Sequence, residues 1–403
     1  MTVTGPDALD AAPGAELDSG RAWLVAGASF LSTFTVFAPA YSFGVFFEAM
    51  EDTFDASKGA TAFVFSIATF LYFLGGVVSG RVGDRVGPRP VVLFGAVVMA
   101  AGLALTAAAP TLWLAYITYG LGVGIGVACG YVPMVAPVGA WFVRRRTFAM
   151  GVAVAGIGCS WLVAPPLVAW IIDAHGWRAA YVVLAVVTLV LLGVASLGTA
   201  PPPGGGGGDD VRPVGEIFRL PGFRVLYAAG FIGTLALFTP FVFLVPYATD
   251  HGISDGAAAA LLAVLGGTSV VGRLGLGALG ANRVVRIYQG CFLALGLSFV
   301  LWLVAGSSYV VLVAFSVVLG LGYGGFIALG PALAAHLFGL RGLGGVLGAM
   351  YTSAGFGGLI GPPFAGLLTD LTGSYTAAIV AALCFGLVAF ALLLRLDEHP
   401  SPG

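Results

Sequence analysis

Arg273 is a single cation inside a long apolar segment. It lies ten residues before Arg283, which corresponds to about 15 Å along a helix. In a hydrocarbon core of roughly 30 Å this guanidinium lies near the middle, too deep for its side chain to reach water comfortably. A planar guanidinium can hold a carboxylate through two parallel hydrogen bonds. A permanent ion pair is the other interpretation, but the neighbouring segments offer no acid at matching depth. We therefore expect Arg273 to bind an anion.

Asp250 ends another apolar segment, within the run Pro246–His251. Its carboxylate is interpreted either as a solvated helix cap or as a group that binds a proton, and the residues alone do not separate the two. Asp173 and Asp370 end two other segments in matching positions. We interpret both of these aspartates as structural caps.

Three tyrosines and a serine are weaker candidates for ligand contacts. Tyr41, Tyr131 and Tyr323 stand beside glycines or prolines, where the backbone leaves room for a cavity, and each has a hydroxyl donor. A single tyrosine more often packs or lies at a membrane interface, but the depth of Tyr131 and Tyr323 argues against an interfacial position. Ser269 precedes Arg273 by one helical turn and shares its face. We expect these four residues to line the cavity that holds the anion.

The composition indicates that a membrane surrounds these residues. The chain has 403 residues, of which 59% are hydrophobic and only 9% charged, with a mean hydropathy of +1.03. Soluble domains have roughly 25% charged residues, so a soluble globular protein is excluded. Apolar runs bounded by glycine, proline or charge predict an all-α protein with twelve transmembrane helices. The expected ranges are 22–47, 60–82, 90–109, 113–142, 147–172, 179–198, 223–248, 256–280, 284–306, 309–337, 343–369 and 375–395.

Two halves of six helices are separated by a linker that is too polar to fold by itself. Three prolines, five glycines and two aspartates follow one another over 201–210. We expect an N-terminal six-helix bundle over 22–199, a linker over 200–222 and a C-terminal six-helix bundle over 223–396. The acidic segment 1–21 lacks the cationic start of a secretory signal, so we interpret it as an uncleaved flexible tail, and 397–403 as a second tail.

The basic residues predict the orientation of the chain. If twelve helices alternate, only Lys58 and Arg178 fall on one side of the membrane, and Arg273 falls within a helix. Because cytoplasmic loops carry an excess of basic residues, we expect a multi-pass protein of the cell membrane with both termini and the linker in the cytoplasm. The residues on the expected cytoplasmic side are Arg21, Arg81, Arg85, Arg89, Arg144, Arg145, Arg146, Arg212, Arg219, Arg224, Arg283, Arg286, Arg341 and Arg395.

The two halves repeat one another. Residues of the fifth and eleventh expected helices recur at an offset of 197, and those of the fourth and tenth at an offset of 200. Because each half has six spans, both copies enter the membrane in the same direction, and a ligand site is expected between the halves near the midplane. The matched pairs are Gly151 and Gly348, Gly158 and Gly355, Pro165 and Pro362, Pro166 and Pro363, Asp173 and Asp370, Gly176 and Gly373, Gly120 and Gly320, Gly122 and Gly322, Gly124 and Gly324, and Gly130 and Gly330.

The sequence indicates no other chemistry. The four cysteines lie within apolar segments without a close C-x-x-C spacing, and the four histidines fall near segment ends without a ligand-like pair. No nucleophile–base pair and no phosphate-binding loop is present. We therefore expect no enzyme activity, metal or cofactor, no nucleic-acid partner and no obligatory protein partner, with the lipid bilayer as the surroundings of the chain.

The run Gly80–Arg89 resembles the G-x-x-x-D-R-x-G-x-R loop of the major facilitator superfamily. The resemblance implies the major facilitator fold, in which this loop latches the two halves in the outward-facing state. Gly80 and Gly83 would allow close approach of helices. The arginines also satisfy the positive-inside rule, which is the preferred interpretation of Arg81. The resemblance implies that Gly80, Asp84, Arg85 and Arg89 take part in this gating.

A narrower resemblance, to the monocarboxylate transporter family, runs over most of the chain. Its most informative match is Gly272-Arg273, where the family places the arginine that holds the substrate carboxylate. Two positions depart from the animal members, because an acidic residue is replaced by Ser269 and a lysine by Tyr41. The other matching residues are Trp141, Phe142, Val143, Arg144, Arg145, Arg146, Ala149, Gly151, Ala155, Gly156, Pro165, Gly361, Pro362, Pro363 and Asp370.

This resemblance implies a secondary active transporter of small monocarboxylates such as lactate or pyruvate. The monocarboxylate anion and a proton would be its partners, moved together as a symport by alternating access between the two halves. The resemblance favours Asp250 slightly as the proton-coupling residue. It also favours Tyr131 and Tyr323 as substrate contacts.

Two other functions are open at this stage. An exchanger of the oxalate:formate type shares the architecture and the arginine, but its relatives carry a lysine within Tyr-Thr-x-Lys-Gly, where this chain has the run Tyr351–Gly355 with Ala354. A dianion would therefore be only half neutralised. A transceptor that senses its ligand is a function of a different class, and the chain shows no extra domain through which it would signal.

Overall fold

The computed structural model describes residues 17–200, 214–220, 222–279, 283–339 and 343–396. The regular structure of these residues is entirely α-helical, which confirms the expected all-α class. The first half contains α1 (Gly20–Tyr41), α2 (Phe43–Phe54), α3 (Lys58–Val86), α4 (Pro88–Ala107), α5 (Leu112–Trp141), α6 (Arg146–His175) and α7 (Trp177–Leu197). The second half contains α8 (Val214–Ile217), α9 (Phe223–Leu237), α10 (Thr239–Asp250), α11 (Asp255–Leu279), α12 (Val284–Ala305), α13 (Tyr309–Phe338), α14 (Leu343–Thr372) and α15 (Thr376–Leu393).

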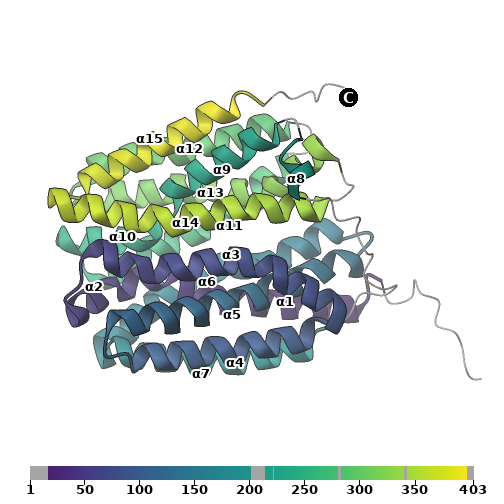
Figure 1. The fold of residues 1–403 in the computed structure, drawn as a ribbon, viewed down its shortest axis with the longest axis horizontal. Coiled ribbons are helices and arrows are strands. Elements are labelled where there is room, and N and C mark those ends of the chain that lie inside the picture. Colours follow the sequence, from purple (N-terminus) through teal and green to yellow (C-terminus); the bar gives the residue numbers. More distant parts are fainter. Residues whose placement is uncertain (1–16, 201–213, 221, 280–282, 340–342, 397–403) are drawn as a thin grey trace, which may run out of the picture.

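The helices of the two halves lie side by side. In Figure 1 the purple and blue helices α1–α7 occupy one side of the molecule, and the green and yellow helices α9–α15 occupy the other. Eleven helical segments of the described residues are long and apolar enough to cross a membrane, and α14, with 30 residues, is a further long helix. The expected linker 200–222 and tails 1–21 and 397–403 lie largely outside the described residues, so their boundaries stay predictions.

The first and seventh expected segments are each broken into two helices. The first breaks at Ser42, between α1 and α2, and the seventh breaks at Phe238, between α9 and α10. Pro39 has no amide hydrogen, so the carbonyl one turn earlier loses its helical donor. Pro240 stands in the first turn of α10, where a missing amide hydrogen is tolerated. Aromatic residues next to the two breaks meet each other, since the rings of Tyr41 and Phe241 lie 5.7 Å apart between their centres.

The repeat is visible in the packing between the halves. Gly158 of α6 packs against Val270 of α11, and Gly355 of α14 packs against Phe73 of α3. Gly158 and Gly355 are 197 residues apart, and so are Phe73 and Val270. The two contacts are therefore copies of each other. The interface of α6 with α11 and that of α3 with α14 are therefore equivalent, which confirms the parallel repeat.

The last residues of the expected N-terminal tail are held in place. The carboxylate of Asp18 accepts hydrogen bonds from the backbone N–H groups of Val143 at 3.3 Å, Arg144 at 3.1 Å and Arg145 at 3.4 Å. These bonds, with that from Arg144 the strongest, lower the pKa of Asp18. The expectation of a flexible tail is therefore wrong for this residue, because backbone donors of the segment after α5 fix its side chain.

Candidate functional site

Arg273 lies in α11 with 7% of the residue exposed. Its Nη1 donates a hydrogen bond of 3.0 Å to the backbone carbonyl of Val154 in α6, so the guanidinium joins the two halves. Its Cζ lies 5.7 Å from the centre of the Tyr323 ring, within the range of a cation–π interaction. Tyr323 stands halfway along α13, which runs from Tyr309 to Phe338. The arginine therefore lies at mid-height in the bundle, as its spacing from the segment end predicts.

Two guanidinium nitrogens of Arg273 are without a partner in the part of the chain that the structure describes. Nε and Nη2 are both buried and make no hydrogen bond, and no acid of the described residues forms an ion pair with this arginine. Nε and Nη2 form one edge of the guanidinium, and their parallel N–H bonds match the two oxygens of a carboxylate. Because a buried cation with open donors is unfavourable by itself, this edge is suited to receive an anion.

Three predicted tyrosines lie around this arginine. The hydroxyl of Tyr41, at the end of α1, lies 3.2 Å from the hydroxyl of Tyr323, a hydrogen bond between the two halves. Tyr131 of α5 contacts Phe37, with 5.6 Å between ring centres, and Phe37 in turn stacks on Tyr41. The structure thus brings together residues of α1, α5, α11 and α13 that are up to 282 positions apart in the sequence. Their roles as substrate contacts stay predictions.

Ser269 has the predicted position but its hydroxyl is already engaged. The side chain is fully buried, and its Oγ donates a hydrogen bond of 2.8 Å to the backbone carbonyl of Gly266 in the same helix. A hydroxyl has one hydrogen to donate, so a ligand beside Arg273 would find in Ser269 an acceptor only, unless the hydroxyl rotates. Its assignment to the site stays a prediction.

Trp161 belongs to this site although the sequence did not single it out. It lies in the middle of α6, with 1% of the residue exposed. Its ring stacks on Tyr323 at 5.6 Å between ring centres, and it makes edge contacts with Tyr41 at 4.3 Å and Phe241 at 4.5 Å. One signal was available, because a tryptophan at the centre of a spanning helix cannot serve in the interfacial belt that this residue type prefers.

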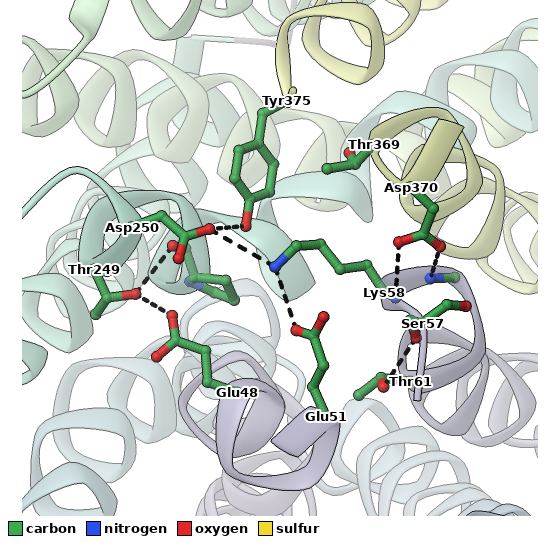
Figure 2. A network of polar contacts seen from close by, with 12 residues as sticks. Glu48, Glu51, Ser57, Lys58, Thr61, Thr249, Asp250, Thr369, Asp370 and Tyr375 are labelled. Carbon is green, nitrogen blue, oxygen red and sulfur yellow. Dashed lines mark hydrogen bonds and ion pairs between the residues drawn. The ribbon is translucent and has the colours of Figure 1, made fainter. Parts of the chain in front are cut away.

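Seven residues join the two halves at one end of the molecule, and we call them the Lys58 cluster (Figure 2). The Nζ of Lys58 lies 3.3 Å from the carboxylate of Glu51 and 3.7 Å from that of Asp250. Glu48 accepts a hydrogen bond from Thr249 across the same interface. The cluster consists of Glu48, Glu51 and Lys58 from the first half, and Thr249, Asp250, Asp370 and Tyr375 from the second half.

Asp370 caps a helix of the opposite half. Its two carboxylate oxygens accept hydrogen bonds of 3.0 Å each from the backbone N–H groups of Lys58 and Gly59, at the start of α3 (Figure 2). A carboxylate is stabilised there by the unsatisfied N–H groups and the positive end of the helix dipole. The interpretation of Asp370 as a cap is confirmed, but the capped helix is α3 rather than its own α14.

Asp250 lies within the Lys58 cluster, with 46% of its side chain exposed. The hydroxyl of Tyr375 donates a hydrogen bond of 2.7 Å to this carboxylate. Burial raises the pKa of Tyr375 and the bond to Asp250 raises it further, so the hydroxyl remains a donor. Within the described residues Asp250 has no contact with Arg273. If Asp250 binds the coupling proton, as predicted, this would change the contacts between the halves rather than contacts with Arg273.

Comparison with known proteins places this architecture in a family. The sequence profile of the Major Facilitator Superfamily matches residues 29–307 and 284–403. Monocarboxylate transporter 13 of Rattus norvegicus is 31% identical over 94% of this chain and 90% of that protein, and monocarboxylate transporter 12 of Homo sapiens is 29% identical over 94% of this chain and 80% of that protein. The chain belongs to the monocarboxylate transporter family of the major facilitator superfamily. It is therefore a multi-pass membrane transporter and not an enzyme.

Solved structures of the superfamily share the fold. A bacterial homolog to the human lysosomal transporter Spinster, in an inward-facing and occupied conformation, matches with a TM-score of 0.77 and 16% identity, over 94% of this chain and 98% of that chain. The same homolog in an inward-facing and unoccupied conformation gives a TM-score of 0.74, over 96% and 100%. The expected major facilitator fold is thus confirmed.

The expected loop Gly80–Arg89 is helical except at Gly87, because α3 runs on to Val86 and α4 begins at Pro88, and it lies at the end of α3 away from Lys58. A Cβ at Gly80 would lie 2.9 Å from the Val132 side chain, so the expected close approach of α3 and α5 is confirmed. Asp84, Arg85 and Arg89 are exposed, and within the described part of the chain none of the three has an ion pair or a side-chain hydrogen bond. Their gating role stays a prediction.

Proposed function

We propose that this transporter moves small monocarboxylates of the lactate and pyruvate type together with protons, by alternating access between its two halves. The observation that carries the proposal is the buried, unpaired Nε–Nη2 edge of Arg273. A carboxylate would complete both hydrogen bonds and neutralise the cation in one step. The relatives named monocarboxylate transporters support the same substrate class.

The surroundings of Arg273 favour a short monoanion. The aromatic side chains of Trp161, Tyr41 and Tyr323 pack against one another beside the guanidinium and would contact a small acyl group. One cation balances one carboxylate. Ala354, at the position where exchangers of dianions carry a lysine, supplies no second charge, so a dianion would leave one carboxylate unpaired.

The two ends of the molecule differ in a way that suits alternating access. The Lys58 cluster connects the halves at one end through ion pairs and hydrogen bonds. We infer that this end is external and that the end with the exposed Asp84 and Arg85 is cytoplasmic, because the arginines concentrate there. In the cell membrane the Lys58 cluster would then separate whenever the site opens outward.

Uptake of labelled lactate into proteoliposomes tests this function. With an inward proton gradient we expect lactate to accumulate, and without the gradient we expect only equilibration. Complete absence of lactate uptake would contradict the substrate class. Uptake that does not depend on the proton gradient but requires oxalate or formate inside the liposomes would instead indicate an exchanger.

Replacing Asp250 by asparagine tests the proton site. Asp250→Asn keeps an acceptor for the Tyr375 hydroxyl but removes the titrating carboxylate. We expect proton-driven accumulation to fall more than exchange of lactate for lactate, because exchange needs no net proton movement. Tyr375→Phe is the matched control, since it removes the hydrogen bond to residue 250 and leaves the titrating carboxylate. Equal loss of accumulation and exchange in Asp250→Asn would reduce Asp250 to a structural role.

Replacing Lys58 by glutamine tests the closure of the external end. The variant removes the ion pair of Lys58 with Asp250, which crosses between the halves and is worth roughly 0.2–1 kcal/mol at a partly exposed site, so the open population should rise by up to about fivefold. Spin labels at Asp52→Cys and Ser254→Cys, both exposed and on opposite halves, report the change as a longer distance between labels. Arg178→Gln is the control, because its hydrogen bond to Ala109 stays within the first half. An unchanged distance distribution in Lys58→Gln would show that Lys58 does not hold this end closed.

A further inference from the structure

Trp161, which packs against the same tyrosine as Arg273, carries a further donor without a partner among the described residues. Its Nε1 is buried and makes no hydrogen bond to any described residue. A buried N–H without an acceptor is unfavourable, and native structures keep few of them. Arg273 and Trp161 share one neighbour, since the Cζ of Arg273 lies 5.7 Å and the Trp161 ring centre 5.6 Å from the centre of the Tyr323 ring. Arg273 and Trp161 therefore both pack against the same tyrosine.

The position of the indole is fixed by its neighbours. Trp161 follows Val154 by seven residues on α6, which is about two turns, so both lie on the helix face that meets α11. Val154 accepts the Nη1 bond of Arg273 from this same face. Edge contacts with Tyr41 and Phe241 enclose the other sides of the ring. The indole ring is thus held among these aromatic residues, and its N–H has no partner in the described part of the chain.

We propose that the Nε1 of Trp161 donates a hydrogen bond to the oxygen on C2 of the substrate, so that the transporter selects 2-hydroxy and 2-oxo monocarboxylates over plain carboxylates of the same length. This inference rests on the proposed function. Such a substrate has two carboxylate oxygens and one further oxygen on the neighbouring carbon. The Nε and Nη2 of Arg273 match the carboxylate, and the Nε1 of Trp161 matches the third oxygen.

Competition between lactate and propionate tests the selection, because propionate differs only by the missing hydroxyl. In the wild-type protein we expect lactate to inhibit uptake of labelled pyruvate at a concentration about tenfold lower than propionate does, the factor expected for one hydrogen bond. Trp161→Phe keeps an aromatic ring and removes the N–H. In this variant the ratio of the inhibitory concentration of propionate to that of lactate should fall close to one. Inhibition by lactate should weaken, and inhibition by propionate should change little.

Trp302→Phe is the matched control. The Nε1 of Trp302 is also buried and unpaired among the described residues, but the ring lies in α12 against Phe299 and Phe315. Removing this N–H should leave the ratio of lactate to propionate at its wild-type value. The control separates loss of a substrate bond from the general effect of replacing a buried tryptophan.

The outcomes distinguish this inference from the function on which it rests. No pyruvate or lactate uptake by the wild-type protein would contradict the proposed function itself. Uptake with equal inhibition by lactate and propionate would overturn the role of Trp161 and leave the function standing, and this measurement needs no variant. A Trp161→Phe protein that reaches the membrane and keeps the wild-type ratio would overturn it as well.

Discussion

Arg273→Lys is expected to reduce lactate uptake at subsaturating concentration roughly tenfold to a hundredfold, the factor for losing one charge-assisted hydrogen bond of about 1.5–3 kcal/mol. The lysine keeps the positive charge but has no planar edge, so the paired contact that Nε and Nη2 would make with a carboxylate is lost. The hydrogen bond from Nη1 to the Val154 carbonyl is lost as well, because the lysine side chain is shorter than that of arginine. The measurement is initial uptake in proteoliposomes, normalised to the amount of inserted protein.

A second arginine provides the control for this substitution. Arg178→Lys changes a residue that stacks on Trp177, with its Cζ 4.3 Å from the ring centre, and takes no part in the central site. We expect this variant to transport lactate at the wild-type rate. Wild-type uptake by Arg273→Lys would remove Arg273 from the substrate site, and the proposed function would lose the observation that carries it.

Ala354→Lys is expected to reverse the ranking of monoanions and dianions. Because an uncompensated buried charge costs about 3 kcal/mol and each 1.4 kcal/mol is tenfold, oxalate or malonate should gain roughly a hundredfold relative to lactate in competition. Lactate would leave the added lysine unpaired, whereas a dianion would pair with both cations. When the site is empty, the added lysine can lose its proton and become neutral. It binds the proton again when a dianion enters.

Ala354 lies beside α13, the helix that carries Tyr323. Ala354 and Tyr351 of α14 line a cavity of about 40 Å³ together with Phe326 and Ile327 of α13. Phe326 and Ile327 follow Tyr323 by three and four residues, so they lie on the same face of α13 as this ring. Ala354→Met is the control for added volume without charge. An unchanged ranking of lactate and oxalate in a folded Ala354→Lys protein would show that residue 354 does not face the substrate.

The sequence determined the helices, their repeat and the central cation, because each depends on the residues of a single segment and not on contacts between distant segments. A bilayer admits only segments that are long and apolar, so the expected ranges follow the observed helices within a few residues at most ends. A charge inside such a segment is rare and costly, which made Arg273 identifiable without a structure. The glycines of the repeat marked positions where helices approach closely, between the halves at Gly158 and Gly355 and within one half at Gly120.

Only the tertiary structure revealed how distant side chains meet. Glu48 and Thr249 are 201 residues apart, and Lys58 and Asp370 are 312 apart, so no local pattern connects them. Trp161 looked like one more apolar residue until its ring was found against Tyr323. Two segment breaks also escaped the hydropathy pattern, because a kink changes the path of a helix and not its apolar character. Hydropathy reflects the transfer of each segment into lipid, whereas these contacts depend on which faces of two halves pack together, and that is decided only once the whole bundle has assembled.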